Sequence, residues 1–283
     1  MGKITFLDGA SGTLLWDLAA ARGIKRMPVF RYNLEAPDLP LQVGKAYVEA
    51  GSEILLANTF SANPPAVEKE GLSCTEEIIR AGISLGKQAA SGKAAVAADF
   101  GPLMTMLEPY GDLEEEEARD IYRLMCHAAN GAGADLFVLE TFLDLELMKI
   151  AAQEALSFDK PVFCSFTFDK SGRTMMGNSP KDIADALTPL GVSAVGINCS
   201  MGPVDALQVL REFKKHTDLP LLFKPNAGLP VTDAEGHITH PYTADLFAKE
   251  CAPAFELADY MGGCCGTNPD CIRALIGAYA DAH

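Results

Sequence analysis

Three cysteines of this sequence have a setting that suits metal chemistry. Cys264 and Cys265 are adjacent within the glycine-rich segment Gly262–Thr267, and Cys199 directly follows the apolar run Ala194–Asn198. Neighbouring residues of a regular strand point to opposite faces, but flanking glycines allow the backbone to turn until both sulfurs converge. Soft sulfur ligands favour zinc, and three protein ligands leave the fourth tetrahedral position open, as in catalytic sites. We therefore predict a zinc site at these three residues.

The predicted donor set also indicates a reaction type. Three thiolates outweigh the charge of Zn²⁺, so the ion is a poor activator of water. It suits the binding of a substrate thiol, the release of its proton and attack of its sulfur on an electrophilic carbon. We expect alkyl transfer rather than hydrolysis. A redox dithiol is disfavoured, because vicinal thiols close a strained ring.

Core packing is the alternative role for a cysteine, since free cysteine is among the most buried residue types. We expect this role for the other five cysteines, which are Cys74, Cys126, Cys164, Cys251 and Cys271.

The elements that would position these residues alternate along the chain. Eight short apolar runs suit strands that are buried on both faces, as in parallel sheets. They are Ile4–Asp8, Glu53–Asn58, Ala94–Asp99, Asp135–Glu140, Val162–Thr167, Ala194–Asn198, Leu221–Pro225 and Asp259–Met261. Between several of these runs, apolar residues recur at helical spacing, in Pro40–Ala50, Glu76–Ala90 and Leu143–Leu156. A further helix is expected to run through Ala128, and a capping box of Asp112 and Glu115 would open it.

Eight alternations of strand and helix predict an α/β fold, a (β/α)8 TIM barrel that forms a single domain over residues 1–283. A doubly wound open sheet is the alternative. It is disfavoured because Asp8–Thr13, after the first run, has neither the glycine spacing of a dinucleotide-binding loop nor a P-loop lysine.

Composition limits the partners. Lys and Arg number 23 against 38 Asp and Glu, so the net charge is −15, and nucleic acid and anionic membranes are disfavoured. No run reaches the roughly 18 apolar residues of a membrane span. The opening residues meet the carboxylate of Asp8 too early for the apolar stretch of a signal peptide. We therefore expect a cytoplasmic protein with reduced cysteines.

In a barrel of this kind, the carboxyl ends of the strands and the loops after them form the active face. A polar or metal-binding residue stands at each of the eight predicted strand ends. They are Asp8, Asn58, Asp99, Glu140, Thr167, Cys199, Asn226 and the Cys264–Cys265 pair.

Six segments resemble the homocysteine S-methyltransferase domain family, in the family's order. They are Asp8–Thr13, Ala57–Phe60, Leu139–Phe142, Gly196–Ser200, Pro225–Gly228 and Gly262–Thr267. Glu108–Gly111 and Thr167–Arg173 are similar to the homocysteine module of cobalamin-dependent methionine synthase. The resemblance implies a (β/α)8 barrel in which Cys199, Cys264 and Cys265 bind Zn²⁺ and homocysteine is methylated to methionine.

The resemblance also implies roles for the other site residues. Glu140 would hold the amino group of homocysteine, and Asp8 would help to orient the amino acid. Backbone N–H groups near Asn58 and Thr59 would bind the substrate carboxylate. We further expect the side chain of Asn226 to approach the zinc when the substrate sulfur is absent. Capping of the loops that follow them is the alternative role for Glu140 and Asp8.

We expect the methyl donor to come from outside this chain, because His283 stands about where a barrel would close. Methylcobalamin on a separate corrinoid protein or domain is favoured by the two segments that resemble methionine synthase. One alternative is a stand-alone enzyme that uses S-methylmethionine or betaine, although the sequence gives little sign of an aromatic cage for a cationic donor. The other is a non-enzymatic subunit that binds zinc or a thiol.

Overall fold

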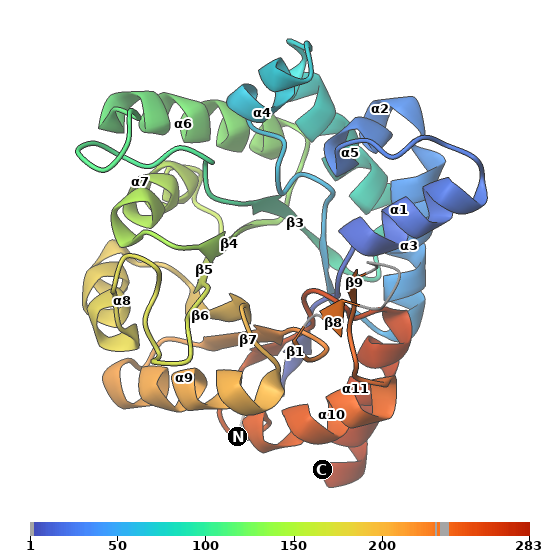
Figure 1. Ribbon diagram of the computed structural model, residues 1–283, viewed down its shortest axis with the longest axis vertical. Helices are drawn as coiled ribbons and strands as arrows, with labels where there is room; N and C mark the ends of the chain where they lie inside the picture. Colours follow the sequence, from blue (N-terminus) through green and yellow to red (C-terminus); the bar gives the residue numbers. More distant parts are fainter. Residues whose placement is uncertain (1–2, 230, 233–237) are drawn as a thin grey trace.

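A computed structural model describes residues 3–229, 231–232 and 238–283 of the chain. Eight parallel strands form one sheet in the order β1-β10-β7-β6-β5-β4-β3-β2. Leu7, just after β1, pairs with Ile54 of β2, and this bridge joins the two ends of the sheet. Helices surround the strands on all sides (Figure 1). The predicted (β/α)8 barrel is confirmed.

The eight barrel strands fall on the eight predicted apolar runs. They are β1 Thr5–Phe6, β2 Ile54–Leu56, β3 Ala95–Phe100, β4 Leu136–Phe142, β5 Val162–Phe166, β6 Ala194–Cys199, β7 Leu221–Pro225 and β10 Tyr260–Met261. Nearly all of their side chains are buried, because each strand packs against the barrel interior on one face and against helices on the other. This double burial explains why the runs are continuously apolar.

The α-helices that cover the barrel are α1 Gly12–Ala21, α2 Tyr32–Glu35, α3 Asp38–Ala50, α4 Pro64–Lys69, α5 Thr75–Ala90, α6 Glu115–Gly131, α7 Leu145–Leu156, α8 Pro180–Leu187, α9 Pro203–His216, α10 Ala244–Cys251 and α11 Pro269–Ala282. Short 3-10 turns lie at Val29–Arg31, Thr188–Leu190 and Ala252–Ala254. The helices expected at Pro40–Ala50, Glu76–Ala90 and Leu143–Leu156 are confirmed as α3, α5 and α7.

The capping box expected at the start of α6 is wrong. This helix begins at Glu115, its N-cap residue is Glu114, and no side chain caps it. Asp112 lies two residues before this N-cap, so Asp112 and Glu115 do not occupy the N-cap and N3 positions that a capping box requires. A capping box does form at α8, where Ser179 and Asp182 bond each other's backbone N–H groups.

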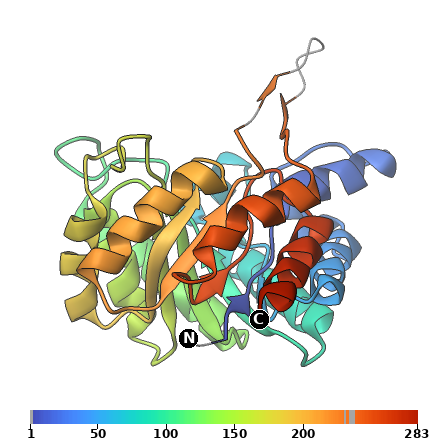
Figure 2. The same ribbon diagram turned by 90° about the horizontal axis from the view of Figure 1, so that it is seen from below.

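A second, antiparallel pair of strands lies in the connection that follows β7. Its strands are β8 Val231–Thr232 and β9 Ile238–Thr239, and the sequence did not predict them. The pair rises above the barrel at the end where the loops after β3 and β5 also project (Figure 2). This is the carboxyl end of the barrel strands, where the predicted site residues belong. No helix among residues 3–229, 231–232 and 238–283 is long and apolar enough to cross a bilayer.

Candidate functional site

The three predicted metal ligands converge at the carboxyl end of the barrel. The sulfurs of Cys199, Cys264 and Cys265 all lie within 4.8 Å of one another, and those of Cys199 and Cys265 are 3.6 Å apart. Sulfurs about 2.3 Å from a tetrahedral zinc ion would be separated by about 3.8 Å, so this donor set fits zinc. All eight cysteines are free, and Cys126, Cys164, Cys251 and Cys271 are buried in the core as expected, whereas Cys74 is half-buried.

The backbone at Cys199 has an unusual conformation. Cys199 and Ser200 have φ angles of 55° and 62°, in the left-handed region that few residues other than glycine adopt. The hydroxyl of Ser200 stabilises this turn by donating to the carbonyl of Asn198 at 3.1 Å and accepting from the N–H of Phe168 at 2.9 Å. Strain of this kind concentrates at functional sites, and here it aims the Cys199 sulfur at the cysteine pair.

The glycines before the cysteine pair have a different role from the one expected. Neither Gly262 nor Gly263 takes the left-handed conformation, and only Gly266, after the pair, does so. A Cβ atom on Gly262 would lie 2.6 Å from the carbonyl oxygen of Asp8, and one on Gly263 would lie 2.4 Å from Oγ1 of Thr267. The two glycines therefore allow close packing against Asp8 and Thr267 rather than a turn between the thiols.

Backbone hydrogen bonds hold the cysteine pair between two other strand ends. The N–H of Gly263 donates to the carbonyl of Asp8 at 3.0 Å, and that of Cys264 donates to Pro225 at 2.9 Å. Pro225 is also the register partner of Cys199 in the neighbouring strand β6. The loop is thus fixed to β1 and β7, and β7 in turn places Cys199.

Without a cation the three thiols would be protonated. The pKa of Cys199 rises to about 11, because its contact with Cys265 and its burial outweigh the opposing hydrogen bond with Cys264. The pKa of Cys265 rises to about 12, since contact with Cys264 and burial outweigh the opposing contact with Cys199. A metal ion favours the thiolate form, so these residues would act as ligands rather than as free nucleophiles.

A cluster of buried charged groups lies inside the barrel beside the sulfurs. Nζ of Lys224 on β7 is 2.6 Å from Oε2 of Glu140 on β4, and both side chains are more than nine-tenths buried. Glu140 is a predicted site residue, whereas sequence reasoning missed Lys224. Burial lowers the pKa of Lys224, but Glu140 and Asp8 raise it by more, so the lysine stays protonated.

Two further carboxyl groups face this ion pair. Oδ2 of Asp8 accepts a hydrogen bond from the N–H of Leu56 at 2.8 Å, while its Oδ1 is buried without a partner. Asp99 at the end of β3 likewise has a buried, unpartnered Oδ1. Burial raises the pKa of Asp8 to about 7, although Lys224 and the Leu56 N–H oppose this. Burial and the charge of Glu140 also raise the pKa of Asp99.

Asn198 connects the charged cluster to the sulfur site, and sequence reasoning assigned it no role. Its Oδ1 accepts from the N–H of Thr141 at 2.8 Å and from the hydroxyl of Ser165 at 2.9 Å. Its Nδ2 donates to Oγ1 of Thr141 at 2.7 Å and lies 3.9 Å from the sulfur of Cys264. Thr141 has a φ of 67° and directly follows Glu140, so Asn198 fixes that strained turn. The sequence offered one indication of this role, because Asn198 is a polar residue inside the otherwise apolar strand β6.

The remaining predicted residues lie around this cluster. Nδ2 of Asn58 donates to the carbonyl of Val29 at 2.7 Å and to Asn33 at 2.8 Å, so its side chain is used within the protein. Oγ1 of Thr59 donates to the carbonyl of Asp99 at 2.8 Å. The binding of a substrate carboxylate by backbone N–H groups near Asn58 and Thr59 stays a prediction.

Asn226 is buried and has an unpartnered Oδ1. Its N–H donates to the carbonyl of Met201 at 3.0 Å, which attaches it to the turn that carries Cys199. The approach of its side chain to a metal ion stays a prediction.

Comparison with known proteins gives consistent results. The homocysteine S-methyltransferase family profile matches residues 5–279. Methionine synthase of Mycobacterium leprae (strain TN) is 32% identical over 96% of this chain, and that of Mycobacterium tuberculosis (strain ATCC 25618 / H37Rv) is 30% identical over 97%. The chain spans only 24% of the length of each of these two relatives.

Solved structures give a similar result. The apo form of the homocysteine methyltransferase MmuM from Escherichia coli superposes with a TM-score of 0.76 at 25% identity. This alignment covers 98% of the present chain and 96% of that one. Since the family profile spans nearly the whole barrel, the chain belongs to the homocysteine S-methyltransferase family.

Proposed function

We propose that this protein is a zinc-dependent homocysteine S-methyltransferase, which forms methionine from homocysteine. The observation that carries the proposal is the convergence of three free cysteine sulfurs at the barrel mouth, next to a buried cluster of carboxyl groups. Zinc bound there would supply a cation that lowers the pKa of an incoming thiol and keeps its sulfur nucleophilic at neutral pH. A cytoplasmic location agrees with the eight free cysteines.

The protein's own residues would bind and orient the acceptor. Cys199, Cys264 and Cys265 would hold the metal at the carboxyl end of the barrel. Glu140 accepts hydrogen bonds from the amino group of homocysteine, and Asp8 orients the same end of the molecule. In the reaction a sulfur–carbon bond to the methyl group forms, the bond between methyl and donor breaks, and the proton of the thiol goes to solvent.

Methylcobalamin on a separate corrinoid protein or domain is the donor that we propose. The similarity to two methionine synthases supports it. Large apolar side chains on the loops after β3 and β5 give further support, because Met104, Tyr110 and Met175 are 92%, 73% and 66% exposed. These loops project from the barrel end that carries the sulfurs (Figure 2). Exposed apolar groups of this size suit contact with a large partner.

A stand-alone enzyme with a small donor such as S-methylmethionine or betaine is the second candidate. The observation that favours it is the superposition on the E. coli homocysteine methyltransferase, of which 96% is covered. Such an enzyme would use the same acceptor site and the same metal.

Parallel assays with zinc-loaded protein test these alternatives. Methionine is measured after incubation of homocysteine with methylcobalamin, S-methylmethionine or betaine, and we expect product with methylcobalamin. Product with only one of the other two donors would instead establish the second candidate. Zinc-loaded, folded protein that forms methionine from none of the three would favour a non-enzymatic zinc-binding subunit.

The metal itself is tested by X-ray absorption at the zinc edge. We expect three sulfur neighbours without homocysteine and a fourth when it is added. Cys265→Ser should lose the metal, while Cys74→Ser, a matched change at a half-buried cysteine outside the site, should keep it. Zinc retained at full stoichiometry in Cys265→Ser would contradict the proposed ligand set.

A further inference from the structure

Lys224 is an unusual residue to find inside the barrel. Its side chain is 2% exposed, and its only hydrogen-bond partner among the described residues is Oε2 of Glu140 at 2.6 Å. Removal of an ammonium group from water costs several kcal/mol, and an apolar pair of similar volume would stabilise the barrel at least as well. The ion pair is therefore poorly explained as a stabilising element of the core.

The groups around this pair are incompletely satisfied. Oδ1 of Asp8 and Oδ1 of Asp99 are buried without hydrogen-bond partners, and Oε1 of Glu140 accepts no hydrogen bond from the described residues. A buried acceptor without a donor carries the full cost of its lost hydration. The buried Oδ1 atoms of Asp8 and Asp99 thus lack donors, and Lys224 pairs with Oε2 of Glu140. A ligand that brings a cationic donor would satisfy these oxygens and favour the ionised form of both carboxyl groups.

A primary ammonium group has the required chemistry, because it offers three N–H donors and one positive charge. We propose that Lys224 is a positioning residue for the acceptor, which holds Glu140 through Oε2 and so directs Glu140 Oε1, with Oδ1 of Asp8 and of Asp99, toward the acceptor's ammonium group. The inference rests on the proposed function for the identity of the acceptor. It adds Lys224 and Asp99 to the acceptor site and assigns Lys224 an indirect role through Glu140.

The pair also accounts for selectivity. Lys224 directly precedes Pro225, whose carbonyl accepts from the N–H of Cys264 at 2.9 Å, and Nδ2 of Asn198 lies 3.9 Å from the sulfur of Cys264, so the cluster lies close to the sulfur site. A thiol bound at the metal would then place its own amino group within reach of the three free oxygens. An acceptor without an amino group would leave these oxygens unpaired, and the site would select against it.

Thiol binding to zinc-loaded protein tests the inference without any methyl donor. Calorimetry compares homocysteine with 4-mercaptobutyrate, which lacks the amino group. In Lys224→Met the Kd for homocysteine should rise by about tenfold or more, since Glu140 is no longer held. The Kd for 4-mercaptobutyrate should change by less than about twofold, because that ligand has no group for the cluster to bind. Lys215→Met, at an exposed lysine of α9, is the matched control and should change neither Kd.

A double mutant tests whether Lys224 acts through Glu140. Homocysteine should bind Lys224→Met/Glu140→Gln no more weakly than it binds Glu140→Gln, because the lysine then has nothing left to position. Lys224→Gln keeps a hydrogen-bond donor for Glu140, so its Kd should lie between those of the wild type and Lys224→Met. It also replaces Lys224→Met in the comparison if that variant does not fold.

The outcomes separate the inference from the proposed function. An equal loss for both thiols, or additive losses in the double mutant, would overturn the role of Lys224. Selective homocysteine binding without methionine formation would overturn the proposed function alone. Zinc-loaded wild type that binds neither thiol would overturn both.

Discussion

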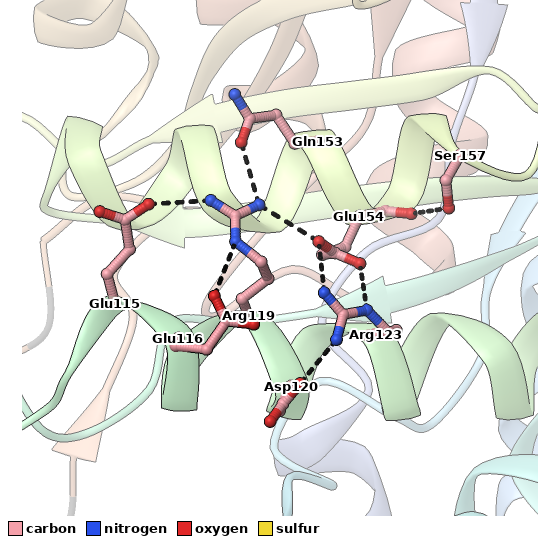
Figure 3. Close-up of polar contacts among 8 residues, drawn as sticks. All are labelled: Glu115, Glu116, Arg119, Asp120, Arg123, Gln153, Glu154 and Ser157. Carbon is pink, nitrogen blue, oxygen red and sulfur yellow. Dashed lines mark hydrogen bonds and ion pairs between the residues drawn. The ribbon is translucent and has the colours of Figure 1, made fainter.

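Two buried carboxylates of this barrel, Glu140 and Glu154, are each paired with a cation, but their surroundings differ. Glu154 lies between α6 and α7, where Oε1 is 3.2 Å from Arg119 and Oε2 is 3.1 Å from Arg123 (Figure 3). The other carboxylates of this network, Glu115, Glu116 and Asp120, are exposed to solvent. In the outer network one buried carboxylate therefore has two guanidinium groups, and both of its oxygens are paired.

The interior cluster has the opposite balance. The ammonium of Lys224 pairs with Glu140, whereas Oδ1 of the buried Asp8 and of the buried Asp99 has no partner. A network that only joins helices can satisfy all of its buried atoms, because surplus charges reach water. A site that binds a charged ligand must keep acceptors free, and it therefore sacrifices stability. The predictions below test this difference between the two regions.

The largest expected effect is that of Cys264→Ala at the barrel mouth. Removal of one of three sulfurs should abolish stoichiometric zinc binding, and methionine formation should fall below detection. The melting temperature of the zinc-free variant should stay within about 4 °C of that of zinc-free wild type, since the sulfur is at the edge of the core. Metal analysis and thermal denaturation provide the measurements. Full zinc content with normal activity would show that Cys264 is not a metal ligand and that the barrel mouth is not the reactive site.

Asn198→Ala should affect both stability and acceptor binding. The change leaves the N–H of Thr141 and the hydroxyl of Ser165 without their partner, at a cost of about 2–4 kcal/mol in the free energy of unfolding. The KM for homocysteine should rise as well, because the turn after Glu140 loses its support. Urea denaturation and steady-state kinetics measure the two effects. Ser165→Ala removes one of the two bonds and should cost less; an equal or larger cost would contradict the role of Asn198.

Much of this site could be predicted because its signals are local in the sequence. Each strand is buried on two faces, so its run is continuously apolar and its polar end residue stands out, as at Asp8 and Glu140. The glycines around Cys264 and Cys265 identified the pair, although they serve close packing against Asp8 and Thr267 rather than a turn.

The parts that were missed depend on contacts between distant segments. Lys224 stands in the apolar run Leu221–Pro225, and its partner Glu140 is 84 residues away in sequence. Only the closed barrel brings the two strands face to face across the interior. Asn198 has the same property, since its partners Thr141 and Ser165 come from β4 and β5. The start of α6 was misplaced because the Asp112–Glu115 spacing fits a capping box, whereas the helix begins only at Glu115 and no side chain caps it.

The free energy of unfolding of Asp8→Asn and of wild type, measured over a range of pH, should show how far the ionised interior cluster destabilises the folded protein. The pKa of Asp8 is about 7 in the folded protein against about 3.8 for an exposed aspartate, so between these pH values the folded state binds more protons. Stability must then fall as the pH rises through this interval, and the loss is complete above pH 7. Relative to Asp8→Asn, zinc-free wild type should lose up to about 3 kcal/mol between pH 5 and pH 8. Urea denaturation at each pH measures the free energy of unfolding. Asp17→Asn, at an exposed position of α1, is the control, and its free energy of unfolding should change with pH as that of wild type does. The same pH dependence in Asp8→Asn and in wild type would refute the prediction.

The smallest expected effect is that of Glu154→Ala in the outer network. Arg119 and Arg123 are 21% and 49% exposed, so both guanidinium groups can turn to water when their shared carboxylate is removed. The free energy of unfolding should therefore fall by only about 1 kcal/mol. Since every buried oxygen there serves helix packing, kcat and the KM for homocysteine should equal those of wild type. Chemical denaturation together with steady-state kinetics checks both statements. A changed KM would mean that the outer network influences the acceptor site through α7 and β4. Full pairing of buried oxygens would then not be enough to identify a purely structural cluster.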